Sequence, residues 1–208
     1  MRWSIKMLMH EVTPAARRRR LAERVSRNAF AHLLEGTPPQ VDEVVATTRG
    51  PAGQVTGALD KLVDRGYAVV EDDRIVGMRG LTVRPTRNRL MLNGCELHTW
   101  CAYDLVGITA ALAADARIDT SCGHCDKPIE VDIRKGEPIG HETVVGWLPC
   151  RTGGRVIDDF CPFAHLFCEE QHLTAWREGM GDIDGEIGNL VQLAEQGRKD
   201  WADVARKR

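Results

Sequence analysis

The chain has 208 residues, 43% of them hydrophobic, and a formal net charge of -2. That length and apolar content allow one good core, or one core with a small appended domain. The near-neutral charge excludes a general electrostatic attraction to nucleic acid or to anionic membranes. No apolar run approaches the roughly 20 residues that span a bilayer, and no signal peptide is recognisable at the N-terminus. We therefore expect a cytoplasmic protein with no membrane partner.

The N-terminal part predicts three helices and a hairpin. The first helix runs from Thr13, a start signal followed by proline, to Gly36, with apolar residues at helical spacing between them. Two further helices are predicted over 38–50 and 51–66, and β-branched residues around an acidic turn predict a hairpin over 67–78. This order of elements is typical of a winged helix.

The chain is therefore expected to be an α+β protein of two domains. Residues 1–79 would form a winged-helix-like helical domain, and residues 80–208 a mixed α/β domain with short antiparallel strands. Winged helices often bind DNA, but the basic residues of the third helix are cancelled by its aspartates. The arginine run at 17–20 is interpreted as a solvated helix face. DNA is thus a disfavoured partner, and a packing role for the first domain is preferred.

Seven cysteines are many for a chain in a reducing compartment, where metal binding or catalysis is a commoner use than disulfides. They are Cys95, Cys101, Cys122, Cys125, Cys150, Cys161 and Cys168. The pattern assigns no role beyond packing to Cys95, Cys150 and Cys168, and it indicates no oligomeric state.

Cys101 lies where a predicted hairpin meets a predicted helix. Alternation around Asn93-Gly94 indicates two strands, and the apolar stretch 102–115 reads as a buried helix. Asp104, three positions after Cys101, would then share a helix face with it. A helix N-terminus favours the thiolate, the form that binds metals, although a lone cysteine is more commonly a small buried hydrophobe.

Cys161 has a similar setting, because Pro162 follows it and proline favours the first helical position. We expect Cys161 to cap a helix that runs to about Gly179, with His165 and Cys168 on its face. For His165 a core or pocket-lining role is preferred over metal ligation. A last helix over 190–201 would close the fold.

A CxxC motif, Cys122-Gly-His-Cys125, lies between apparent strands at 117–119 and 129–133. Such a motif is half of a zinc site or of a redox site. No second CxxC accompanies it, and no βαβ pattern surrounds it. A simple turn is therefore favoured over a zinc ion held here with ligands from elsewhere.

Two thiolates beside a carboxylic acid suit a soft, thiophilic metal rather than magnesium or calcium. If the metal carries a carbon group, the acid can deliver a proton to that carbon and cleave the metal–carbon bond. Burial of the acid would raise its pKa and keep its proton near neutral pH.

Three stretches, 80–112, 116–123 and 160–167, resemble the organomercurial lyase (alkylmercury lyase) family, most clearly at "WCAYD" and "DFC". The resemblance implies a winged-helix-like domain joined to a catalytic domain, with no cofactor required. It implies that Cys101 and Cys161 capture mercury, that Asp104 supplies or relays the proton, and that Cys122 is structural. The organomercurial substrate would leave as a hydrocarbon, and Hg(II) would pass to low-molecular-weight thiols or a mercuric reductase.

The chain also departs from the family pattern, with Pro162 where a second cysteine is common and with an unusual "CGHC". Alternative functions are therefore a family member acting on another organometal or small molecule, a thiolate metal-responsive DNA-binding regulator, and a structural zinc protein. The intact trio of Cys101, Asp104 and Cys161 favours cleavage of a carbon–mercury bond.

Overall fold

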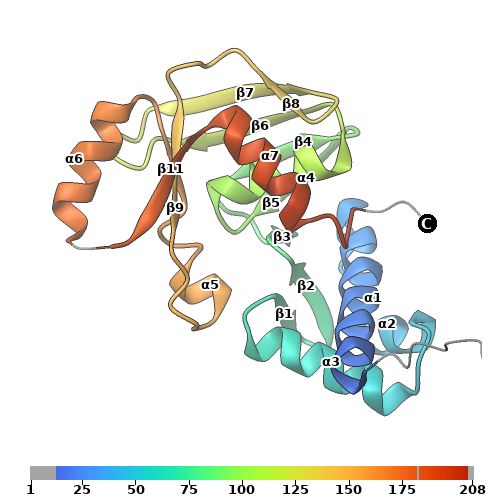
Figure 1. Ribbon diagram of the computed structural model, residues 1–208. Helices are drawn as coiled ribbons and strands as arrows, with labels where there is room; N and C mark the ends of the chain where they lie inside the picture. The colour runs from blue at the N-terminus through green and yellow to red at the C-terminus, as the bar shows by residue number, and fades with distance from the viewer. Residues whose placement is uncertain (1–12, 182, 206–208) are drawn as a thin grey trace, which may run out of the picture.

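The computed structural model describes residues 13–181 and 183–205, which form an α+β fold (Figure 1). The helices are α1 (Pro14–Leu34), α2 (Val41–Thr47), α3 (Ala52–Asp64), α4 (Ala102–Leu112), α5 (Val156–Asp159), α6 (Glu170–Met180) and α7 (Leu190–Asp200). The strands are β1 (Ala68–Glu71), β2 (Arg74–Met78), β3 (Leu81–Thr82), β4 (Arg89–Leu92), β5 (Cys95–Thr99), β6 (Ala116–Ser121), β7 (Pro128–Arg134), β8 (Glu137–Ile139), β9 (Val145–Pro149), β10 (His165–Phe167) and β11 (Gly185–Asn189).

The three N-terminal helices match the ranges predicted from the sequence. The Thr13 hydroxyl accepts a hydrogen bond from the Ala16 N–H at 3.2 Å, so it caps α1 as expected. Phe30 and Leu33 of α1 are buried in the core together with Val55 and Leu59 of α3. Within the described ranges, no helix combines the length and the apolar composition needed to cross a membrane.

An eight-stranded sheet extends through most of the molecule in the order β1-β2-β3-β5-β4-β6-β7-β8, with every neighbouring pair antiparallel. Its two predicted hairpins are confirmed. Asp72 and Asp73 adopt positive φ in the first turn, as Asn93 and Gly94 do in the second, and two such residues in succession give the backbone twist that tight hairpins need. The short β3 joins the first hairpin to the rest, so the hairpin over 67–78 belongs to the same sheet as the following strands.

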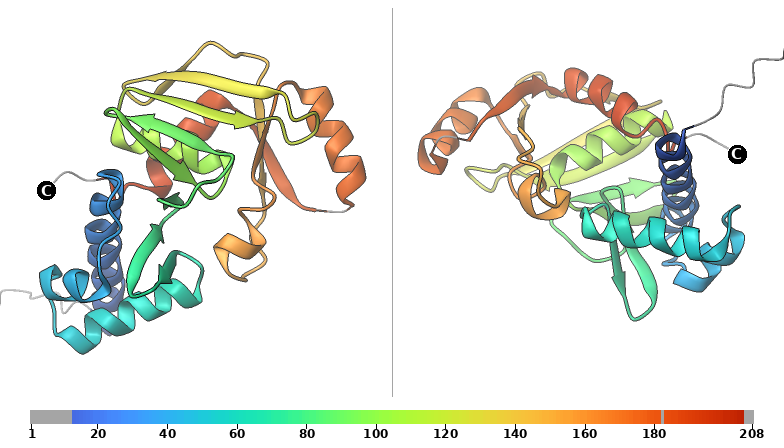
Figure 2. Two further views of the ribbon diagram at one scale, coloured as in Figure 1. Left: turned by 180° about the vertical axis from the view of Figure 1, so that it is seen from behind. Right: turned by 60° about the horizontal axis from the view of Figure 1, so that its bottom comes forward.

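Helices α4 and α7 lie side by side against this sheet (Figures 1 and 2). Their close approach explains Gly107, which is otherwise unfavourable inside a helix. A Cβ on Gly197 of α7 would stand 2.2 Å from the Cα of Gly107, and a Cβ on Gly107 would meet the Trp201 ring at 2.3 Å. The two glycines therefore let the C-terminal helix close over the buried α4, as the sequence predicted for 190–201.

A second sheet, in the order β10-β9-β11, carries α6 at the opposite end from the N-terminal helices (Figure 1). Here the predicted helix from Cys161 to about Gly179 is wrong. Cys161 lies in a turn after α5, residues 165–167 form a strand, and α6 begins only at Glu170. The apolar residues that suggest helical spacing instead pair with β9, where His165 lies opposite Trp147.

Candidate active site and a second cysteine cluster

Cys101, Asp104 and Cys161 are brought together by elements distant in the sequence. One sulfur from each cysteine and a carboxylate oxygen of Asp104 all lie within 4.8 Å of one another. The three residues are only 2%, 4% and 6% exposed, respectively. Cys101 and Asp104 come from the β5–α4 junction, whereas Cys161 follows α5.

The N-terminus of α4 fixes the relative positions of Cys101 and Asp104. Cys101 is the N-cap residue, and its backbone N–H donates to Asp104 Oδ2 at 2.9 Å. The Asp104 N–H in turn faces the Cys101 sulfur, which completes a reciprocal capping box. Thiol and carboxyl are thus held side by side by backbone groups. The Ala102 N–H donates to the Ala164 carbonyl at 3.3 Å and ties this helix end to the segment that follows Cys161.

Gly80 lies directly against the Asp104 carboxyl group. A Cβ at this position would approach Asp104 Cγ at 2.5 Å, and Gly80 has φ +90°, which side chains rarely adopt. Its carbonyl accepts a hydrogen bond from the Trp100 N–H at 2.8 Å, one residue before Cys101. Sequence reasoning missed Gly80. The only available signal is a glycine between two short strands.

Burial dominates the electrostatics of Cys101 and Asp104. It raises the pKa of Asp104 from 3.8 to about 7, although hydrogen bonds from Cys101 and the charge of Arg79 oppose the rise. The pKa of the Cys101 thiol also lies well above its usual value, because of burial first and then of Cys161 and Asp104. The helix N-terminus alone was expected to favour a thiolate at Cys101. In the free protein burial outweighs this effect, so the Cys101 thiol keeps its proton near neutral pH, whereas Asp104 titrates in that range.

The C-terminal residues also reach this region. The Tyr103 hydroxyl donates to Asp200 Oδ2 at 2.7 Å, and burial together with Asp200 holds the Tyr103 pKa above its usual range. Trp201 Nε1 donates to the carbonyl of Arg79, next to Gly80, at 2.7 Å. Sequence reasoning had given the last helix only a closing role.

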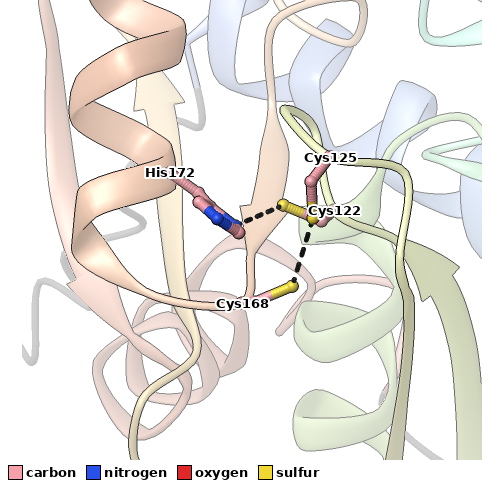
Figure 3. A group of neighbouring side chains, drawn as sticks. All are labelled: Cys122, Cys125, Cys168 and His172. Atoms are coloured by element: carbon pink, nitrogen blue, oxygen red, sulfur yellow. Dashed lines mark hydrogen bonds between the residues drawn. The ribbon is translucent and has the colours of Figure 1, made fainter.

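A second cluster joins Cys122, Cys125, Cys168 and His172, whose ligand atoms also lie within 4.8 Å of one another. Figure 3 shows the four side chains pointing toward one another, two from the turn between β6 and β7, one from after β10 and one from α6. The pKa of Cys122 is lowered to about 6. Burial acts to raise it, but backbone N–H groups of the turn and of Cys168 outweigh that effect. The pKa of Cys168 is raised to about 12, because of burial and its two cysteine neighbours.

The turn predicted for the CxxC motif is present, between β6 and β7. Sequence reasoning missed its partners because Cys168 and His172 both fell inside the wrongly predicted helix from Cys161 to about Gly179. His165 is half-buried, and Arg87 Nη2 lies 2.7 Å from its Nδ1. Burial and Arg87 lower its pKa to about 4, and His165 belongs to neither cluster. Neither Cys95 nor Cys150 belongs to either cluster.

Comparisons with known proteins all point to one family. The alkylmercury lyase family model matches residues 81–202. An alkylmercury lyase of Bacillus cereus is 26% identical over 78% of this chain and 72% of its own length. Those of Streptomyces lividans and Pseudomonas putida are 28% and 29% identical, over 70% and 69% of this chain and 68% of each relative. A crystal structure of the mercury-bound form of MerB2 superposes with a TM-score of 0.81 at 27% identity, covering 89% of this chain and 91% of that one.

The fold and the buried pair of thiols beside a carboxylic acid define a small α+β enzyme suited to a thiophilic metal. The match over 81–202 is more specific: the chain belongs to the alkylmercury lyase family, whose members cleave the carbon–mercury bonds of organomercurials. It is a carbon–mercury lyase of the kind that confers mercury resistance.

Proposed function

We propose that Cys101, Asp104 and Cys161 carry out the cleavage, with the two sulfurs binding mercury and Asp104 protonating the carbon. The observation that carries this assignment is the enclosure of two thiol sulfurs and one carboxyl group within 4.8 Å at a buried site. A relative crystallised in a mercury-bound form supports mercury binding by this scaffold.

Capture begins with one thiol. Its sulfur displaces the ligand X from R–Hg–X and gives Cys–S–Hg–R, and the thiol proton leaves with X as HX. The second sulfur then binds the same mercury atom, and its proton passes to the Asp104 carboxylate or to solvent. Asp104 is the natural acceptor because a carboxylate oxygen lies within 4.8 Å of both sulfurs.

Protonolysis follows. Donation from two sulfurs raises the electron density on the carbon bound to mercury. The protonated Asp104 transfers its proton to that carbon, the carbon–mercury bond breaks, and R–H leaves. Hg(II) remains bridged between Cys101 and Cys161, and Asp104 is a carboxylate again. Its pKa of about 7 suits both the acceptance and the donation of a proton near neutral pH.

The N-terminal residues act as a packing module in this proposal. Residues 1–79 form a winged-helix-like domain and residues 80–208 the catalytic domain, although 1–12 lie outside the described residues. The end of α3 supports the segment that leads to Cys161, since the Val156 N–H donates to the Arg65 carbonyl at 3.0 Å. Cleavage takes place in the cytoplasm without a cofactor, and Hg(II) leaves to low-molecular-weight thiols or to a mercuric reductase.

The test is anaerobic incubation with phenylmercury and excess thiol, with benzene release as the readout. Asp104→Asn keeps the size of the side chain and a hydrogen-bond acceptor for the Cys101 N–H, but it removes the acid. We expect it to lower benzene release by about 100-fold or more while it still retains one mercury per chain. Cys101→Ser and Cys161→Ser should lose both release and tight mercury binding.

Cys150→Ser is the matched control, because Cys150 is exposed and outside both clusters. Wild-type rates in Asp104→Asn would refute the role of the carboxyl group. Mercury binding without benzene release by the wild type would instead indicate a scavenger or sensor, and binding of duplex DNA would then be measured.

A further inference from the structure

We propose that Cys122, Cys125, Cys168 and His172 form a tetrahedral zinc site that is separate from the mercury-handling trio. The proposal goes beyond the lyase activity and does not depend on it. Its basis is the convergence of three thiol sulfurs and one imidazole nitrogen from three separate elements (Figure 3).

The distances between ligand atoms fit a single zinc ion. Zinc binds sulfur at about 2.3 Å and nitrogen at about 2.0–2.1 Å, so a tetrahedron places two sulfurs about 3.8 Å apart and sulfur and nitrogen about 3.6 Å apart. Cys125 Sγ and Cys168 Sγ are 3.8 Å apart, and Cys122 Sγ and His172 Nδ1 are 3.6 Å apart. Both pairs therefore have the lengths of tetrahedron edges before any ion is added.

The orientation of His172 also fits metal binding. Its Nε2 lies 3.2 Å from a carboxylate oxygen of Glu169, which favours a proton on Nε2 and leaves the lone pair of Nδ1 facing Cys122. A carboxylate beside the other ring nitrogen is common at histidines that bind metals.

The turn that supplies Cys122 and Cys125 has a close fit to its neighbours. The Asp126 N–H donates to the Cys122 carbonyl at 3.1 Å, and the Gly123 N–H donates to the Leu166 carbonyl of β10 at 2.9 Å. A Cβ on Gly123 would approach Phe167 at 2.9 Å, so the turn packs directly on the strand that precedes Cys168. Ligand spacings of two residues (122–125) and three residues (168–172) are those of structural zinc sites.

The donor set selects zinc among the common metals. Three thiolates and one imidazole in a tetrahedral arrangement suit zinc and exclude magnesium and calcium, which take oxygen ligands. Four protein ligands leave no position for a substrate, which is the mark of a structural rather than a catalytic zinc ion. The bound ion would connect the β6–β7 turn and α6 to the segment 161–168, which also carries Cys161.

The experiment measures zinc by mass spectrometry in full-length protein that has been purified under reducing conditions. We expect about one zinc per chain in the wild type, in Cys150→Ser and in Cys101→Ser, and a loss to background in Cys168→Ser and His172→Ala. The Cys101→Ser variant separates this site from the catalytic trio. Loss of zinc should also lower Tm by roughly 10 °C.

Metal-stripped wild type provides a second measurement that does not require the variants to fold. Addition of Co(II) should produce the charge-transfer and ligand-field bands of tetrahedral thiolate coordination, and Zn(II) should abolish them. Reduced wild type that takes up neither metal would overturn the proposal, as would stoichiometric zinc in a folded Cys168→Ser variant. So would a Cys125–Cys168 disulfide in a chain that cannot bind metal after reduction. None of these outcomes alters the test of benzene release.

Discussion

The two cysteine clusters contain similar atoms in different surroundings. The trio of Cys101, Asp104 and Cys161 is buried throughout, whereas only Cys122 is buried in the second cluster. Burial raises the pKa values of Cys101 and Asp104, while backbone N–H groups lower that of Cys122 to about 6. The Cys101 thiol therefore keeps its proton near neutral pH, and Asp104 can both accept and donate one there.

The two clusters also differ in the number of side chains that could bind a metal ion. Two sulfurs leave room at the metal for a carbon group, and the neighbouring carboxyl group can supply a proton. Three sulfurs and an imidazole fill a tetrahedron and leave no such room. On these two proposals, the surroundings and number of the ligands, more than the presence of thiols, distinguish a reactive cluster from a structural one.

The strongest way to disturb the trio without changing its members is Gly80→Ala. The new Cβ would collide with the Asp104 carboxyl group at a positive φ, so we expect a loss of roughly 3–5 kcal/mol in stability and a large fall in benzene release. Gly94→Ala is the matched control, since Gly94 has φ +80° but no atom within 4 Å of the added Cβ. Chemical denaturation measures both, and equal losses would show that only backbone strain matters.

The raised pKa of Asp104 predicts a pH-dependent cost of keeping it buried. Folded Asp104 titrates at about 7 and the unfolded group near 3.8, so the folded state binds more protons between these values. The contribution of Asp104 to the free energy of unfolding should be greatest below about pH 4 and should be lost as pH rises through 7. Compared with Asp104→Asn, the wild type should lose about 2–4 kcal/mol between pH 4 and pH 8.

Urea unfolding of both proteins across this pH range provides the check. A constant difference between wild type and Asp104→Asn would mean that Asp104 is ionised at an ordinary pKa, and its role as a proton donor near neutral pH would lose its support.

Glu169→Gln sharpens the account of the second cluster. Removal of the carboxylate that faces His172 Nε2 should weaken zinc binding by about 10- to 100-fold while the four ligands remain. Glu170→Gln alters the adjacent acidic residue at the start of α6 and serves as the control. Competition with a fluorescent chelator measures the affinity, and equal weakening in both variants would assign the effect to general charge.

Tyr103→Phe should have the smallest effect. It removes the hydroxyl that donates to Asp200 and should cost about 1 kcal/mol in stability. The Tyr103 hydroxyl bonds to Asp200 and not, among the described residues, to a sulfur or the carboxyl group of the trio, so benzene release should change less than about threefold. A loss as large as that of Asp104→Asn would place Tyr103 in the catalytic machinery.

Local sequence signals predicted much of the fold. These signals act over a few residues, so the sequence pattern alone was sufficient to predict the elements. They are Thr13 before a proline, the Asp72-Asp73 and Asn93-Gly94 turns, and the apolar run of α4. The family resemblance pointed to the trio, and the structure brings its three members together.

The parts of the fold and of the site that the sequence did not predict depend on contacts between distant segments. Strand β10 has three residues, too few to show a period of two, and its pairing with β9 overrides the helical spacing around Pro162. That single error hid Cys168 and His172 as partners of the CxxC motif. Gly80 escaped notice because only the folded backbone brings it against Asp104, 24 positions later in the chain.

The segment 161–168 begins at one cluster and ends at the other, with hydrogen bonds from Ala102 and Gly123 to its carbonyl groups between them. Its length is therefore constrained at both ends. A single inserted or deleted residue would turn the side chains of β10 to the opposite face and displace either Cys161 or Cys168. In evolution the residues between the two cysteines should accept substitutions but not changes in number, and natural variation in loop size should be confined to other parts of the chain.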